Sequence, residues 1–147
     1  MPIMRIITLL VMMVSVLVIV SCNPDFTSVE HGQTVSGELT KSDSCWKDCS
    51  IPPPGQTPTC TVVCIDRYQI VLGSGISYTV SFNSNPDIQF EDLEGGTFTV
   101  NNLSQGHSFA ASYGSATWLP IKSGTNVIGV FGQYDSLPAT YTFRITP

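Results

Sequence analysis

The sequence has few charged residues, and basic residues are the scarcest. Only 12% of its 147 residues are Asp, Glu, Lys or Arg, and six basic side chains stand against eleven acidic ones, for a net charge of −5. Binding to nucleic acid, like electrostatic binding to an anionic membrane surface, relies on clustered Lys and Arg, so the composition argues against both. A hydrophobic content of 42% argues against a disordered chain. We expect one folded domain.

Sequence signatures of catalysis are also missing. The chain has two histidines, His31 and His107, and no G-x-S-x-G, HExxH or phosphate-loop motif. Both histidines precede predicted strands, where surface positions are expected. We therefore expect no catalytic residue and no cofactor.

The first 21 residues differ from the rest of the chain. They contain all four methionines and none of the aromatic residues, and Arg5 precedes an apolar run from Ile6 to Val20. As a helix, these 15 residues would be about 22 Å long, shorter than the roughly 30 Å hydrocarbon core of a bilayer. The pattern predicts a secretory signal peptide over residues 1–21.

The residues after the apolar run resemble the lipobox of bacterial lipoproteins. Ile19-Val20-Ser21-Cys22 has an aliphatic residue, a tolerated residue, a small residue and then cysteine. The resemblance implies cleavage before Cys22, acylation of Cys22, and a lipid bilayer as partner. It places the protein in the bacterial cell envelope, facing the periplasm or the exterior. The alternative is an ordinary signal peptide with a chance cysteine after it.

The mature chain would begin with a short tether and continue as one domain. Residues 22–30 are polar and show no periodicity, and residues 31–147 form the predicted domain. The mature chain keeps all eleven acidic residues and five of the six basic ones.

The remaining four cysteines predict two nested disulfides. Cys45 and Cys49 are four residues apart, and so are Cys60 and Cys64. Opposed residues of an antiparallel hairpin have a constant sum of residue numbers, and the pairs Cys45–Cys64 and Cys49–Cys60 both satisfy it. An exported protein favours disulfides over the alternative, a zinc site, for which the C-x3-C spacing is unusual. The bridges would staple residues 44–64, whose Pro-rich tip is either an inert insertion or a rigid recognition loop.

Alternating apolar and polar residues predict an all-β domain. The clearest case is residues 76–82, where every even position is apolar and every odd one is Ser or Thr. Further strands are predicted at the following ranges: 33–39, 65–72, 87–92, 97–101, 108–112, 116–121, 126–131 and 141–145. Turn residues connect them, and no stretch keeps a helical period. The fold class predicted is an antiparallel, jelly-roll-like β-sandwich.

Several of these strands resemble bacterial pre-peptidase C-terminal (PPC) domains. The similar segments are Gly32–Leu39, Asp66–Ile70, Gly75–Val80, Asp87–Phe90 and Tyr141–Ile145. The resemblance covers residues 30–146 and implies a jelly-roll-like sandwich that is a non-catalytic attachment of secreted enzymes. The stapled excursion 44–64 departs from the family pattern, as does the segment 124–130.

Candidate ligand residues are few. Asp87, Glu91, Asp92 and Glu94 are the densest acidic group, and Asp87 and Glu91 share a strand face as weak calcium candidates. They lack the pattern of a calcium loop, so a solvated strand end is the preferred interpretation, and no metal site is predicted.

Exposed aromatic residues are the other candidates, because sugar-binding sandwiches use them as stacking platforms. We expect Trp118 and Phe131 in the core, and Trp46, Tyr134 and Tyr113 as candidate ligand-binding residues.

The sequence therefore predicts a membrane-anchored, non-catalytic binding or adhesion module for a glycan or an envelope protein. Two alternatives remain: a structural or accessory subunit of an exported complex, and a hydrolase with an unrecognised site.

Overall fold

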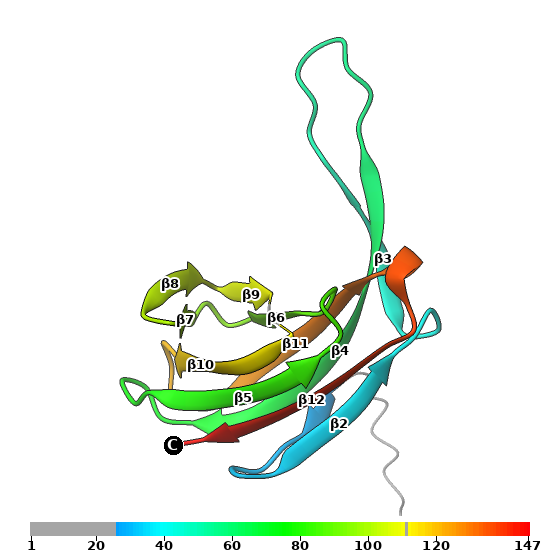
Figure 1. Ribbon diagram of the computed structural model, residues 1–147. Helices are drawn as coiled ribbons and strands as arrows, with labels where there is room; N and C mark the ends of the chain where they lie inside the picture. The colour runs from blue at the N-terminus through cyan, green and yellow to red at the C-terminus, as the bar shows by residue number, and fades with distance from the viewer. Residues whose placement is uncertain (1–25, 111) are drawn as a thin grey trace, which may run out of the picture.

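A computed structural model describes residues 26–110 and 112–147 as a β-sandwich of two six-stranded sheets (Figure 1). Sheet A contains β1 (Phe26–Ser28), β3 (Ser44–Cys49), β4 (Cys60–Leu72), β6 (Gln89–Asp92), β9 (Ser108–Ala110) and β11 (Gly124–Gln133). Sheet B contains β2 (Thr34–Leu39), β5 (Tyr78–Ser84), β7 (Thr97–Val100), β8 (Leu103–Gly106), β10 (Tyr113–Leu119) and β12 (Ala139–Thr146). A 3-10 turn, η2 (Tyr134–Ser136), precedes β12. The predicted all-β sandwich is confirmed.

Strand order shows how the chain alternates between the layers. Sheet A runs β1-β4-β11-β6-β9, with β3 also paired to β4, and sheet B runs β2-β12-β5-β10-β7-β8. Among the described strands, every pairing is antiparallel except that of β1 with β4, which is parallel. Within the described residues no helix is long and apolar enough to cross a bilayer. The predicted signal peptide and Cys22 lie outside these residues.

Inward-facing side chains of the two sheets form an aromatic core. The rings of Phe82, Phe90 and Phe109 lie 5.0–5.8 Å apart between centroids, and Phe98 packs on both Phe109 and Trp118. Ring pairs at such separations add to the free energy that their burial contributes. Trp118 and Phe131 are buried, as predicted, at 0% and 8% exposure, but only Trp118 belongs to the central cluster.

Three local expectations are corrected. Phe26–Ser28, placed in the polar tether, is a strand paired with β4 at Arg67 to Gln69. Ile76, expected on the buried face of the next strand, is 50% exposed, because β5 begins only at Tyr78. The strand β8 was not expected. None of its four side chains is fully buried, so its sequence does not alternate between apolar and polar residues.

Candidate functional site: the stapled arm and its surroundings

The hairpin of β3 and β4 extends well beyond the sandwich as a narrow arm (Figure 1). We define the arm as residues 44–65. Its strands pair in register from Ser44 opposite Ile65 to Cys49 opposite Cys60. Opposed residues therefore have the constant sum of residue numbers that the cysteine spacing predicted. The structure has both predicted bridges, Cys45–Cys64 and Cys49–Cys60, each with its Cα atoms 4.0 Å apart. The four sulfurs that a zinc site would need are thus bonded in pairs.

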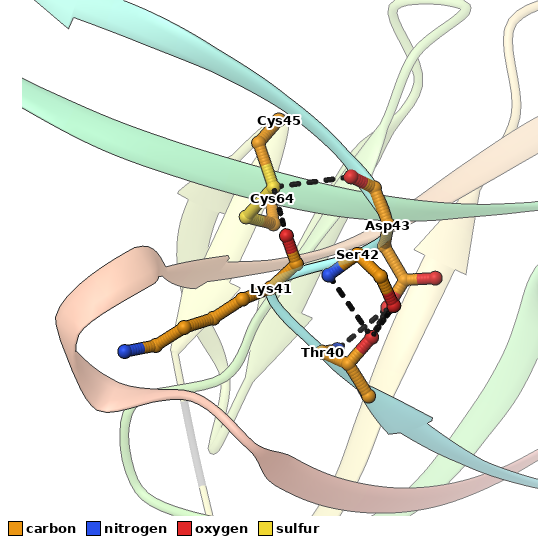
Figure 2. Close-up of a disulfide and its surroundings, with 6 residues drawn as sticks. All are labelled: Thr40, Lys41, Ser42, Asp43, Cys45 and Cys64. Atoms are coloured by element: carbon orange, nitrogen blue, oxygen red, sulfur yellow. Dashed lines mark hydrogen bonds between the residues drawn. A yellow bond between two sulfur atoms is a disulfide. The ribbon is translucent and has the colours of Figure 1, made fainter.

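The two bridges, the inner Cys45–Cys64 and the outer Cys49–Cys60, lie in different environments. Cys64 is fully buried at the top of the core, whereas Cys49 and Cys60 are both exposed. Figure 2 shows the turn beside the inner bridge, where the Asp43 carboxylate accepts hydrogen bonds from the backbone and hydroxyl of Thr40 at 2.6 and 2.9 Å. The Cys45 sulfur lies 3.1 Å from the Asp43 carbonyl oxygen, a close contact without a hydrogen, since a disulfide sulfur has none to donate. The inner bridge therefore fixes the arm to the body, and the outer one supports the tip.

The tip of the arm, residues 50–59, is rich in proline and carries no charged side chain. Ser50 closes it with a backbone hydrogen bond to the Thr59 carbonyl at 2.9 Å and a hydroxyl that accepts from the Thr59 amide at 3.2 Å. Between these residues, Ile51 is 97% exposed and is followed by three prolines. Proline restricts the backbone even in the unfolded chain, so little conformational entropy is left to lose when the tip binds.

Trp46 packs at the base of the arm on the outer face of sheet A. Its ring meets that of Phe131 edge-on at 5.7 Å, and Phe131 in turn covers Gly129. A Cβ at Gly129 would lie 2.7 Å from Phe131 and 2.9 Å from Ile65, so only glycine leaves room for the phenyl ring. Trp46 keeps 41% of its surface exposed.

The three predicted aromatic ligand residues are not brought together. Tyr134 is half-buried against the core, and the Lys41 ammonium lies 4.7 Å from its ring centroid. Tyr113 is 83% exposed but belongs to sheet B, on the other side of the sandwich from Trp46. A single sugar-stacking platform near the arm is therefore not formed by these residues.

The acidic group divides between surface and core. Asp87 is exposed ahead of β6, and Glu91 is half-buried on β6, where burial raises the pKa of its carboxyl and the nearby His107 opposes the shift. Asp92 was expected at a solvated strand end; it is instead 2% exposed. Among the described residues no group of three or more His, Cys, Asp or Glu is placed to hold a metal ion.

Both histidines bond to backbone carbonyl groups. His31 Nε2 lies 2.8 Å from the Val71 oxygen, and His107 Nδ1 lies 2.8 Å from the Gly96 oxygen. Each ring therefore holds a loop to a strand.

A partly buried polar cluster that joins β4 of sheet A to β12 of sheet B was missed by the sequence interpretation. The Tyr141 hydroxyl on β12 donates to the Asp66 carboxylate on β4, and the Tyr68 hydroxyl lies 2.5 Å from that of Tyr141. Burial raises the pKa of Asp66, partly offset by the Tyr141 hydrogen bond, and it also raises the pKa of both tyrosines. The signal was available: Asp66 has the same parity in β4 as the inward-facing Cys64 and Tyr68.

Comparison with known proteins adds two solved structures. No family model matches the chain, and no curated protein matches it. The pre-peptidase C-terminal domain of collagenase from Bacillus anthracis has 13% identity and a TM-score of 0.49, over 83% of this chain and 95% of that one. PliG of Aeromonas hydrophila, a periplasmic inhibitor of g-type lysozyme, has 13% identity and a TM-score of 0.38, over 83% and 98%. The first is a domain of the kind that the sequence motifs resemble. Neither similarity carries an argument about ligand or activity, because both TM-scores are below 0.5.

Proposed function

We propose that the protein is a lipid-anchored component of the bacterial cell envelope whose sandwich presents the arm to a protein partner. In this proposal the chain binds and does not catalyse. The lipobox-like Ile19–Cys22 supplies the anchor, with Cys22 as the acylated residue.

The observation that carries the proposal is the construction of the arm. Two disulfides and a six-pair register stiffen a hairpin that extends away from both sheets, and its tip exposes Ile51 beside three prolines. A narrow, preordered projection fits a concave surface on another protein and loses little entropy on binding. Residues 50–63 carry no charge, so the contact would not need steering by opposite charge.

A protein partner suits the arm better than a glycan does. The arm has one exposed ring, Trp46 at its base, and the other two candidate rings lie elsewhere. Of the alternatives, an accessory subunit of an exported complex is compatible with the same arm. A hydrolase would need a reactive group near a partner base, whereas both histidines are bonded to carbonyl oxygens.

Site-specific photo-crosslinking in the living cell tests the arm. A photoreactive residue replaces Ile51 at the tip or, as control, Ile121, which is 65% exposed near the opposite end of the sandwich. The expected result is a protein adduct of one defined mass from position 51 only, and its loss when Pro52–Pro54 are replaced by glycine. Equal adducts from both positions, or none from position 51, would contradict the proposal.

Mass spectrometry of the membrane-extracted protein tests the anchor separately. The expected N-terminal peptide begins at an acylated Cys22, and Cys22→Ser should prevent acylation and release the protein from the membrane fraction. An unmodified Cys22 in the native protein would refute the anchor and leave the arm proposal standing.

A further inference from the structure

The outer face of sheet B carries mainly hydroxyl and amide side chains across four adjacent strands. Strand register aligns β2, β12, β5 and β10 side by side, and their alternate residues, such as Val80 and Phe143, point into the core. The side chains on the opposite, outer face include Thr34, Ser36, Ser81, Asn83, Ser115 and Thr142. All but Thr142 are exposed.

This face is hollowed. One hollow of about 480 Å³ crosses all four strands, and a second of about 390 Å³ adjoins it, sharing Asn83 and Thr142. Strands in a sheet are about 4.8 Å apart, so the first hollow extends about 14 Å from β2 to β10. It is a shallow depression that is open to solvent along the sheet.

Tyr113 stands at the β10 end of the hollow. It lies in register with Asn83 and is 83% exposed, which is unusual for a large ring in a described strand of this domain. The next residue, Gly114, has φ of 141°, a conformation that favours glycine and turns the chain where the ring projects. The face of an exposed tyrosine ring is a surface on which the C–H face of a sugar can stack.

Few charged side chains lie on this face, where Glu38 on β2 and Arg144 on β12 both point outward. Arg144 is the one charged residue among those that line the two hollows, and no carboxylate lines either. A nucleic-acid site would need several basic side chains. Hydroxyl, amide and guanidinium groups around one exposed ring instead match a ligand that carries many hydroxyl groups.

From this we infer that the outer face of sheet B binds a short oligosaccharide. One sugar ring stacks on Tyr113, and Asn83, Thr142 and Arg144 hydrogen-bond its hydroxyl groups. This site lies on the opposite sheet from the arm and depends on neither the arm nor the lipid anchor.

Calorimetric titration of the full-length protein in detergent tests the inference. The probes are cellotetraose, maltotetraose, the tetramer of β-1,4-linked N-acetylglucosamine, and tetragalacturonate. At least one should bind, and Tyr113→Ala should weaken that binding about tenfold or more, whereas Tyr113→Phe, which keeps the ring, should bind nearly as well. Asn83→Ala should also weaken binding.

Two controls keep a folding defect apart from a lost site. Because Tyr113 and Asn83 are exposed, their variants should unfold within about 2 °C of the wild type. Trp46→Ala removes an exposed ring from the other sheet and should leave saccharide binding unchanged. Failure of all four probes to bind, or binding that survives both Tyr113→Ala and Asn83→Ala, would overturn the site and show the hydroxyl face to be a solvated surface only.

Discussion

The Trp118 indole nitrogen donates a hydrogen bond of 2.7 Å to Asp92 Oδ2 inside the sandwich. The second carboxylate oxygen, Oδ1, accepts from the Glu94 backbone amide at 2.7 Å. One buried carboxylate thus joins the core of sheet B to the turn that follows β6. Since it is 2% exposed, protein donors must replace the water it loses.

Replacing Asp92 by the isosteric Asn should destabilise the fold. The amide keeps one acceptor oxygen, so either the Trp118 indole or the Glu94 amide is left facing an NH₂ group. We expect a loss of about 1–3 kcal/mol in the free energy of unfolding by urea. Asp87→Asn, at an exposed position nearby, should change it by less than about 0.5 kcal/mol. Equal effects of the two substitutions would show that the buried hydrogen bonds contribute nothing.

The two disulfides should open in a fixed order under mild reduction. Thiolate attack requires access to a sulfur, and the Cys49–Cys60 bridge is exposed while Cys64 is buried. Alkylation followed by peptide mass spectrometry should find Cys49 and Cys60 modified first. Reduction of Cys45–Cys64 first, or of both together, would contradict this order.

Losing the inner bridge should also cost more stability. The double variant Cys45→Ser, Cys64→Ser removes the link between two residues that are 19 apart in the sequence. We expect the free energy of unfolding to fall by about 2–4 kcal/mol. The matched variant Cys49→Ser, Cys60→Ser loosens only the tip, so its thermal unfolding should stay closer to that of the wild type.

Asp66 should make stability depend on pH. Burial raises the pKa of its carboxyl above the ordinary 3.8, so the folded state holds a proton that the unfolded state releases. The contribution of this group is therefore favourable near pH 4 and is lost as pH rises through the folded-state pKa. Asp66→Asn cannot ionise, so its stability relative to wild type should be higher at pH 7 than at pH 4. Urea unfolding at both values measures this difference, and Asp135→Asn, at an exposed position, is the control. A difference that does not change with pH would show that Asp66 does not titrate differently on folding.

Gly129→Ala should displace Phe131 and loosen Trp46. The added methyl would overlap the phenyl ring and Ile65, and overpacking of this kind costs about 1–3 kcal/mol. Quenching of Trp46 fluorescence by iodide should increase. Adding Phe131→Leu should recover part of the lost stability, because the smaller side chain makes room for the methyl. Unchanged stability in Gly129→Ala would show that the ring moves aside without cost.

Period-two alternation predicted most of the sandwich because most strands have one buried face. It worked for β5, where Tyr78, Val80 and Phe82 are buried and their neighbours exposed. It could not reveal β1, whose three side chains are all exposed and which exists through its backbone pairing with β4. The disulfide register was predictable because the two cysteine pairs have equal spacing, so one antiparallel register brings both pairs of partners opposite each other.

The same alternation places Asp66 and Asp92 inward, but Asp92 was expected at a solvated strand end because of its charge, and Asp66 was not singled out. Each has the parity of buried neighbours, and each is compensated by a residue distant in sequence: Tyr141 for Asp66 and Trp118 for Asp92. Such partners cannot be identified before the fold is known. The hydroxyl face of sheet B was missed for a related reason, since it is assembled from four strands that are not consecutive in the chain.

The short strand β1 sets the distance at which this domain could stand from a bilayer. Phe26, paired with Arg67, is four residues beyond Cys22, and four residues of any conformation span at most about 14 Å. From the level of Arg67, β4 alone continues seven residues to Cys60, about 23 Å at the rise of a strand, before the tip begins. With Cys22 acylated, the link between the lipid and Phe26 would be shorter than this stretch of β4. On that proposal the domain stays close to the membrane, so its partner would have to come within reach of the arm at the membrane surface.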